Sequence, residues 1–244
     1  TPEKMSGVAV VLFDITQSEQ AEQRRREFTA NVSHELKTPL QSISGYSELL
    51  MRGMARQEDI QPFAQRIYGE TQRLIQLVQD IINLSQLDEG SSYQWQQANL
   101  FAIAAEVTGS LEHFAEEKQV RLTLEGSDTM LRGVPELLRG IVYNLTDNAI
   151  KYNHPGGSVT VTVSRQKDEA VLTVSDNGIG IPEGEQDRIF ERFYRVDKSR
   201  SKEVGGTGLG LSIVKHAAFL HKAAIDVTSQ LGAGTTIQVR FPIQ

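Results

Sequence analysis

Two neighbouring side chains in the first part of the sequence pair a nucleophile with a base. Glu35 follows His34 directly, and Thr38 comes one helical turn later. Imidazole titrates near pH 6.5, so much of it is neutral at pH 7, and an adjacent carboxylate can hold the ring proton or take up developing charge. A histidine on the polar face of a long helix is also an ordinary solvated residue. The pair therefore indicates chemistry only if the rest of the chain brings a reaction partner to it.

A group of polar side chains further along the chain suits a metal ion and phosphate. Asn144 and Asn148 are four residues apart, so both lie on one helical face, with Lys151 beside them. An amide oxygen is a good neutral ligand for Mg²⁺, which also takes phosphate oxygens and water, and lysine can offset phosphate charge. A solvated helix face explains this segment equally well when it is considered alone.

Asp176 ends a predicted strand and is followed by Gly178 and Gly180. A carboxylate in this position can accept a hydrogen bond from an exocyclic amino group, which adenine has and guanine replaces with a carbonyl oxygen. The glycines permit positive φ angles and close approach of the backbone to a planar ring. A plain Asp-Gly turn is the alternative interpretation.

An aromatic segment after this turn has the composition of a lid. The run from Phe190 to Arg195 supplies two aromatic anchors, and the polar, charged stretch that continues to Val204 has little to bury. Arg195 lies between the anchors and this stretch, where it can reach a terminal phosphate.

Gly206, Gly208 and Gly210 belong to a glycine-rich loop that runs into a helix. Exposed amides at a helix N-terminus bind phosphate oxygens. The loop is not a Walker loop, because it has no Gly-Lys-Ser/Thr, and its glycine spacing does not match the Rossmann fingerprint. A flexible connector has the same composition.

Hydrophobic periodicity predicts two long helices around His34. The first runs from about residue 17 to Met54, and the second has apolar residues at 3-4 spacing over positions 60–85. Each helix carries one apolar stripe, so a hairpin of the two cannot cover its own core, whereas two hairpins paired as a four-helix bundle can. A purely structural coiled coil is the alternative.

After a polar linker near residues 89–94 the pattern changes to mixed α/β. Helices are predicted at Leu100–Lys118, Pro135–Tyr152, Glu185–Glu191 and Gly208–Leu220. Strands are predicted at Val120–Leu124, Thr129–Arg132, Val159–Ser164, Ala170–Ser175, Ile225–Ser229 and Thr236–Phe241. The expected fold is an all-α helical hairpin that forms a dimeric four-helix bundle, followed by an α/β sandwich with a mixed sheet and helices on one face.

Composition excludes several classes of function. The 244 residues carry 25 basic and 31 acidic side chains, a net charge of −6, which does not favour nucleic-acid binding. Without cysteine there is no disulfide framework, thiolate zinc site or cysteine nucleophile. The sequence shows no long apolar run and no signal peptide, so we expect a cytoplasmic fragment without membrane contact, which leaves open a membrane anchor elsewhere in a longer protein.

Taken in order, the segments around Asn148, Asp176, Phe193 and Gly208 resemble the N, G1, F and G2 boxes of the histidine-kinase ATP-binding domain. Residues 28–40 likewise resemble the H box of that family. The resemblance covers residues 28–241 and implies the catalytic core of a two-component sensor histidine kinase. On this basis residues 28–90 form the dimerisation and phosphotransfer domain and residues 91–244 the ATP-binding domain.

Residues 1–27 resemble the end of a PAS-like sensor domain followed by a signalling helix. The apolar run at residues 8–13 supplies the strand of this interpretation. A frayed leader without a role is the alternative.

The resemblance also implies roles for individual residues. His34 is the phospho-acceptor, Glu35 its base, and Thr38 contributes to phosphatase activity toward a response regulator. ATP and Mg²⁺ are the implied cofactors, with Asn148 as the metal ligand, and the implied partners are a second copy of the chain and the receiver domain of a response regulator. Nucleotide contacts are implied for Asn144, Asn148, Lys151, Tyr152, Asp176, Gly178, Gly180, Ile181, Arg195, Gly206, Thr207, Gly208, Leu209 and Gly210.

The sequence departs from the family pattern at one place, and two rival functions remain to be considered. The sequence has Lys222, Ala223 and Ala224 where the family usually has a glycine pair, which predicts an altered turn because the easy left-handed helix stop is missing. Gyrase-type, mismatch-repair and chaperone ATPases share the ATP site, but His34 in its box argues against them. A scaffold with a decayed site is the other rival, and the intact Asn148 and Asp176 argue against it.

Overall fold

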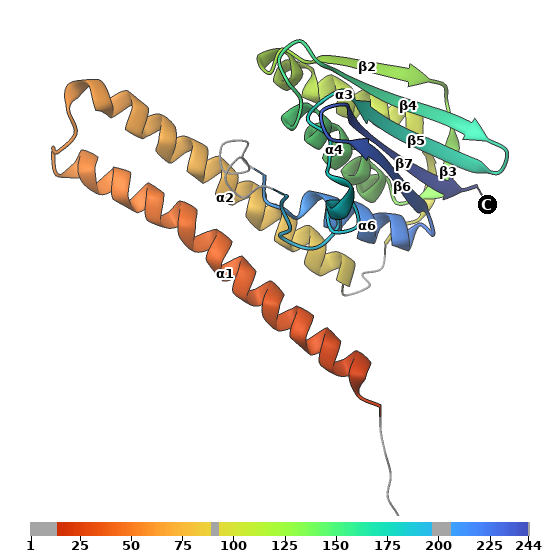
Figure 1. Cartoon of the computed structure of the whole chain (residues 1–244), viewed down its shortest axis with the longest axis horizontal. Coiled ribbons are helices and arrows are strands. Elements are labelled where there is room, and N and C mark those ends of the chain that lie inside the picture. Colours follow the sequence, from red (N-terminus) through yellow and green to blue (C-terminus); the bar gives the residue numbers. More distant parts are fainter. Residues whose placement is uncertain (1–13, 89–92, 197–205, 244) are drawn as a thin grey trace, which may run out of the picture.

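A computed structural model describes residues 14–88, 93–196 and 206–243. A long helical hairpin lies beside an α/β unit (Figure 1). The strand predicted at residues 8–13 lies outside the described residues. No helix within the described ranges is long and apolar enough to cross a bilayer.

The hairpin consists of α1 (Thr16–Met51), a 3-10 turn η1 (Gln57–Asp59) and α2 (Ile60–Asp88). Gly53 lies in the connection with a φ of +66°, a conformation that glycine adopts without strain. Tyr46 and Phe63 meet across the hairpin with their ring centroids 5.0 Å apart. The predicted hairpin is thus confirmed, although α1 ends at Met51, before the predicted Met54.

The hairpin leaves an apolar seam uncovered by the described chain. Tyr68, Ile75 and Ile82 recur every seven residues on α2 and are 67%, 57% and 44% exposed. Val78 lies between them and is 43% exposed. A heptad-spaced seam of this kind is typical of a helix that packs against another helix.

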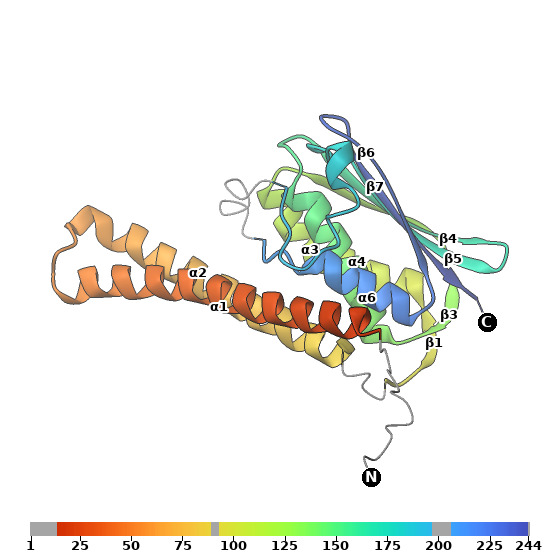
Figure 2. The ribbon, with the colours of Figure 1, turned by 60° about the horizontal axis from the view of Figure 1, so that its bottom comes forward.

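The α/β unit contains a five-stranded mixed sheet with the order β2-β4-β5-β7-β6, in which β2 and β4 are parallel and the other neighbours antiparallel. Helices α3, α4 and α6 cover one face of this sheet (Figure 2). A separate antiparallel pair joins β1 to β3. The elements are β1 (Gln96–Asn99), α3 (Leu100–Glu117), β2 (Arg121–Gly126), β3 (Met130–Gly133), α4 (Pro135–Lys151), β4 (Ser158–Gln166), β5 (Glu169–Asp176), η2 (Glu183–Glu185), α6 (Gly210–Leu220), β6 (Ala224–Gln230) and β7 (Gly234–Pro242).

Alternation along the strands builds the core between sheet and helices. Val159, Val161 and Val163 of β4 are fully buried, as strand periodicity requires for residues that face the helical layer. Leu138 and Ile141 of α4 meet them in the same apolar cluster. This packing fixes α4, whose opposite face carries the predicted polar residues, against the sheet.

Three local predictions need correction. The helix expected at Glu185–Glu191 is only the 3-10 turn η2 followed by turns, because Gln186 donates to the carbonyls of Ile181 and Ser229 and holds the segment on β6. Strand β1 was missed because it is polar, and only Ala98 of its residues is buried. The turn after α6 is not altered, since Lys222 adopts the left-handed conformation with a φ of +55°.

Candidate active site

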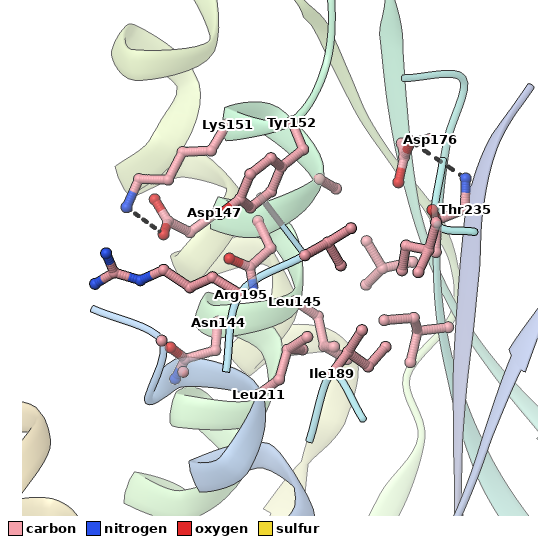
Figure 3. Close-up of a pocket in the computed structure, with 18 of the residues that line it drawn as sticks. Asn144, Leu145, Asp147, Lys151, Tyr152, Asp176, Ile189, Arg195, Leu211 and Thr235 are labelled. Carbon is pink, nitrogen blue, oxygen red and sulfur yellow. Dashed lines mark hydrogen bonds and ion pairs between the residues drawn. The ribbon is translucent and has the colours of Figure 1, made fainter. Parts of the chain in front are cut away.

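A cavity of about 570 Å³ lies between α4, the start of α6 and the ends of β5 and β7. Figure 3 shows Asp176 and Thr235 on one side of it and Lys151, Asp147 and Arg195 on the other. The predicted nucleotide residues that line the cavity are Asn144, Asn148, Lys151, Tyr152, Asp176, Gly180, Ile181, Arg195, Thr207, Gly208 and Gly210. The structure therefore brings residues of all four sequence segments together around one cavity.

Asp176 marks the apolar end of the cavity. Its carboxylate accepts hydrogen bonds from the backbone amides of Gly178 at 2.8 Å and Thr235 at 3.3 Å. Burial raises the pKa of Asp176, and these two hydrogen bonds oppose the rise. The side chains of Ile179, Ile181, Val174, Ile189 and Ile237 line the same cavity. A carboxylate beside apolar walls suits a flat, uncharged ring that carries a hydrogen-bond donor.

Two glycines beside the cavity approach other groups closely. At Gly180, which has a φ of +68°, a Cβ atom would lie 2.0 Å from the carbonyl oxygen of Gln230, so the backbone there requires glycine. At Gly210 a Cβ atom would lie 2.6 Å from the Oδ1 of Asn144. A side chain at position 210 would therefore push the Asn144 side chain aside.

The polar end of the cavity lies on α4. Lys151 Nζ forms an ion pair with Asp147 Oδ2 at 2.7 Å. Burial raises the pKa of Asp147, while the charge of Lys151 and its hydrogen bond act to lower it. The sequence reasoning missed Asp147, although its position four residues before Lys151 was the signal.

The side-chain amides of Asn144 and Asn148 on α4 fit a magnesium ion that takes most of its ligands from a bound substrate and from water. The Nδ2 of Asn144 donates to the Gly140 carbonyl at 2.8 Å, so its oxygen faces the cavity side, near Gly210. Within the described part of the chain no group of three or more His, Cys, Asp or Glu side chains forms a metal cage. Mg²⁺ commonly takes one or two protein ligands and fills its remaining positions with phosphate oxygens and water, which Asn148 in the cavity wall allows.

His34 lies exposed on α1, next to a carboxylate that is held by two arginines. Glu35 Oε2 pairs with Arg73 Nη2 at 3.3 Å and with Arg195 Nη2 at 3.1 Å. Arg195 also donates to the carbonyl of Gly206. Thr38 Oγ1 donates to the carbonyl of His34 at 3.2 Å. The sequence predicts that Arg195 reaches a phosphate. In the structure Arg195 lines the cavity, but its guanidinium group contacts Glu35 of the hairpin.

The hairpin touches the glycine-rich loop through a second polar contact. Asp80 of α2, 5% exposed, accepts a hydrogen bond from Thr207 Oγ1 at 2.6 Å and another from Gln76 Nε2 at 2.8 Å. Both Asp80 and Gln76 line the cavity. Sequence reasoning missed them because the periodicity of α2 predicts helix packing and carries no signal for a contact with a distant loop.

Apolar side chains complete the contact between hairpin and α/β unit. Leu77 and Leu84 of α2 form one buried cluster with Leu209 and Ile213, so Leu209 packs toward the hairpin and does not line the cavity. Gly178 and Gly206, also predicted to contact nucleotide, do not line it either. The apolar cluster and the two polar contacts together fix the position of the loop relative to α2.

Two family models match the chain. The model of the histidine kinase-, DNA gyrase B- and HSP90-like ATPases matches residues 133–244, and that of the His Kinase A (phospho-acceptor) domain matches residues 24–90. Sensor histidine kinase WalK of Bacillus subtilis is 37% identical over 98% of the chain. The chain belongs to the two-component sensor histidine kinases. It spans 40% of the length of WalK.

Solved histidine kinases have the same fold. ShkA in complex with AMPPNP is 26% identical, covers 88% of this chain and 45% of its own, and superposes with a TM-score of 0.64. ThkA in complex with the response regulator protein TrrA is 20% identical and covers 96% of this chain and 68% of its own, with a TM-score of 0.70. For this histidine kinase core, the hairpin carrying His34 is the phospho-acceptor domain and the α/β unit the ATPase-like domain.

Proposed function

We propose that the chain is an ATP-dependent autokinase that phosphorylates His34 and passes the phosphoryl group to an aspartate of a response regulator. The observation that carries the proposal is the cavity, which has Asp176 at its apolar end and Asn148 and Lys151 at its polar end. The same chain presents an exposed histidine beside a carboxylate.

Adenine selection follows from the apolar end. The carboxylate of Asp176 accepts a hydrogen bond from the exocyclic amino group of adenine, while Ile181 and Tyr152 pack around the base and ribose. Guanine would place a carbonyl oxygen against this carboxylate, and two acceptors repel.

The triphosphate lies toward α4 and the glycine-rich loop. Lys151 supplies positive charge, Asn148 and Asn144 offer amide oxygens for Mg²⁺, and the backbone amides of Gly208 and Gly210, which line the cavity, donate to phosphate oxygens. Bound Mg²⁺ offsets charge on the phosphates. Positioning and charge neutralisation are the main demands of phosphoryl transfer, and these groups meet both.

Transfer then needs His34 in line with the terminal phosphate. The Nε2 lone pair of His34 attacks phosphorus, the bond from phosphorus to the bridging oxygen breaks, and ADP leaves with the electron pair. Glu35 holds the proton on Nδ1 and accepts it as the ring becomes positively charged. Because Glu35 pairs with Arg73 and Arg195 in the structure, it must exchange these contacts before it can act on His34.

Partners follow from the hairpin. The exposed heptad seam of α2 fits a second copy of the chain, which would bury it in a four-helix bundle. The ThkA–TrrA complex supports a receiver domain as the second partner. The role proposed for Thr38, which is exposed and one helical turn from His34, is to orient a water for dephosphorylation of that partner.

Acid stability of the product tests the class of reaction. Phosphohistidine is labile in acid and stable in base, so incubation of the chain with γ-³²P-ATP and Mg²⁺ should give label that is lost in dilute acid. ATP hydrolysis without any label on the chain would instead favour the gyrase-type ATPases, which share this cavity but have no histidine acceptor. Acid-stable label would contradict a histidine acceptor.

A further inference from the structure

Two groups that suit phosphate recognition are held by carboxylates of the hairpin. Thr207 donates its hydroxyl proton to Asp80 at 2.6 Å, and Arg195 pairs with Glu35 at 3.1 Å. Both groups line the nucleotide cavity, and both carboxylates come from the neighbouring domain. The two contacts are chemically alike. In each of them a carboxylate oxygen of the hairpin accepts from a donor that a phosphate oxygen could otherwise use.

A hydroxyl has one proton, so Thr207 cannot donate to Asp80 and to a phosphate oxygen at the same time. The same contact is buried, with Thr207 8% and Asp80 5% exposed, so water cannot readily replace a lost partner. Arg195 has more donors, but its side chain is only 9% exposed and is already divided between Glu35 and the Gly206 carbonyl.

Charge acts in the same direction. Asp80 and Asp147 both line the cavity, and within the described residues Lys151 is already paired with Asp147. Because Lys151 and Asp147 offset each other, a triphosphate would add its negative charge beside the buried carboxylate of Asp80, and like charges repel.

We propose that Asp80 and Glu35 compete with nucleotide phosphates for Thr207 and Arg195, so that docking of the hairpin and binding of nucleotide oppose each other. The inference rests on the proposed function and deepens it: arrival of ATP weakens the two polar contacts that hold the α/β unit on the hairpin. Release of Glu35 from Arg195 then leaves Arg73 as its one remaining ion-pair partner among the described residues, which brings the base closer to availability for His34. Linkage requires the effect to be reciprocal, so weakening the docking contact must strengthen nucleotide binding.

Asp80 offers the cleaner test, because it lies outside the proposed chemistry. Asp80→Asn keeps the shape and an acceptor oxygen but removes the charge, and Asp80→Ala removes both. Asp59→Asn, the same substitution at the far tip of the hairpin where Asp59 pairs with Arg56, is the matched control. Dissociation constants for AMPPNP with Mg²⁺, measured by calorimetry on the whole chain, are the readout, with melting temperatures as the check on folding.

The expected result is tighter AMPPNP binding by about fivefold or more in Asp80→Ala, with a smaller gain in Asp80→Asn and none in Asp59→Asn, in line with typical couplings between sites. The gain from Asp80→Ala should shrink in a Thr207→Val background, because the shared hydroxyl is then absent. Unchanged or weaker binding in folded Asp80→Asn and Asp80→Ala would overturn the proposal, as would an equal gain in both backgrounds. A wild-type chain that binds no AMPPNP would refute the proposed function itself, and the competition with it.

Discussion

The guanidinium of Arg195 contacts the carboxylate of Glu35 at 3.1 Å, across 160 residues of sequence. This contact joins the segment that follows η2 in the α/β unit to the residue beside the proposed acceptor. A second contact, from Thr207 to Asp80, joins the glycine-rich loop to α2. The structure therefore has the two domains docked through groups that the proposed reaction also needs.

Asp176→Asn should weaken nucleotide binding by at least about fivefold. The amide of asparagine can present a donor where adenine also presents one, and a buried mismatch of this kind costs about 1–3 kcal/mol. The measurement is AMPPNP affinity, with Asp168→Asn in the exposed β4–β5 turn as the matched control. Equal affinities for wild type and Asp176→Asn would exclude the proposed adenine contact.

The chain should be a dimer, because the α2 seam exposes large apolar side chains at heptad spacing. Light scattering should give about twice the 27.1 kDa of one chain. Ile75→Glu should shift the mass toward the monomer, since it places a charge in the seam, whereas Ala105→Glu on the exposed side of α3 should not. A monomeric wild-type chain at micromolar concentration would argue against the four-helix bundle.

How far the sequence predicts this molecule depends on the range of the interactions. Apolar periodicity predicted the hairpin and the mixed sheet, and most of the residues that the four segments marked as nucleotide contacts line the cavity, because these features depend on local patterns. The contacts of Asp80 and Leu209 were not predictable in this way, since they join elements far apart in sequence. Lys222 shows a third case, because it adopts the left-handed conformation that glycine favours while local backbone hydrogen bonds, including one from its amide to the Phe219 carbonyl, close the end of α6.

His221 should make stability fall as the solution becomes more acidic. Its Nε2 accepts from the amide of Val134 at 3.0 Å, and burial lowers the pKa of His221 below its usual value of 6.5. A lowered pKa means that the folded state binds fewer protons, so this stabilisation is complete above pH 6.5 and is lost as pH falls through the folded-state value. The buried carboxylates Asp80, Asp147 and Asp176, whose pKa values are raised, act in the opposite direction.

Because these groups oppose each other, the effect of His221 is measured by comparing the pH dependence of the melting temperature between variants. The melting temperature of wild type and of His113→Gln, a substitution of an exposed histidine on α3, should fall more between pH 8 and about pH 5.5 than that of His221→Gln. Parallel pH profiles for all three proteins would show that His221 is not responsible.

Thr38→Ala should lower dephosphorylation of the response regulator by about tenfold or more while leaving autophosphorylation and the melting temperature near those of wild type. The exposed hydroxyl of Thr38 donates to the His34 carbonyl, a local bond that Ser33 also makes to Thr29. Ser33→Ala is therefore the matched control, because it removes the same kind of bond one residue before His34. Loss of kinase activity in parallel, or no change in dephosphorylation, would leave Thr38 with only its local bond to the His34 carbonyl beside Pro39.

The identity of the acceptor is the central claim, and labelling of a single-residue variant tests it most directly. His34→Gln, compared with wild type and with His113→Gln, should incorporate no acid-labile ³²P from γ-³²P-ATP, while its affinity for AMPPNP stays within about twofold of wild type, because the acceptor and the nucleotide cavity belong to different domains. His113→Gln should label like wild type. Acid-labile phosphate on His34→Gln at the wild-type level would contradict the account.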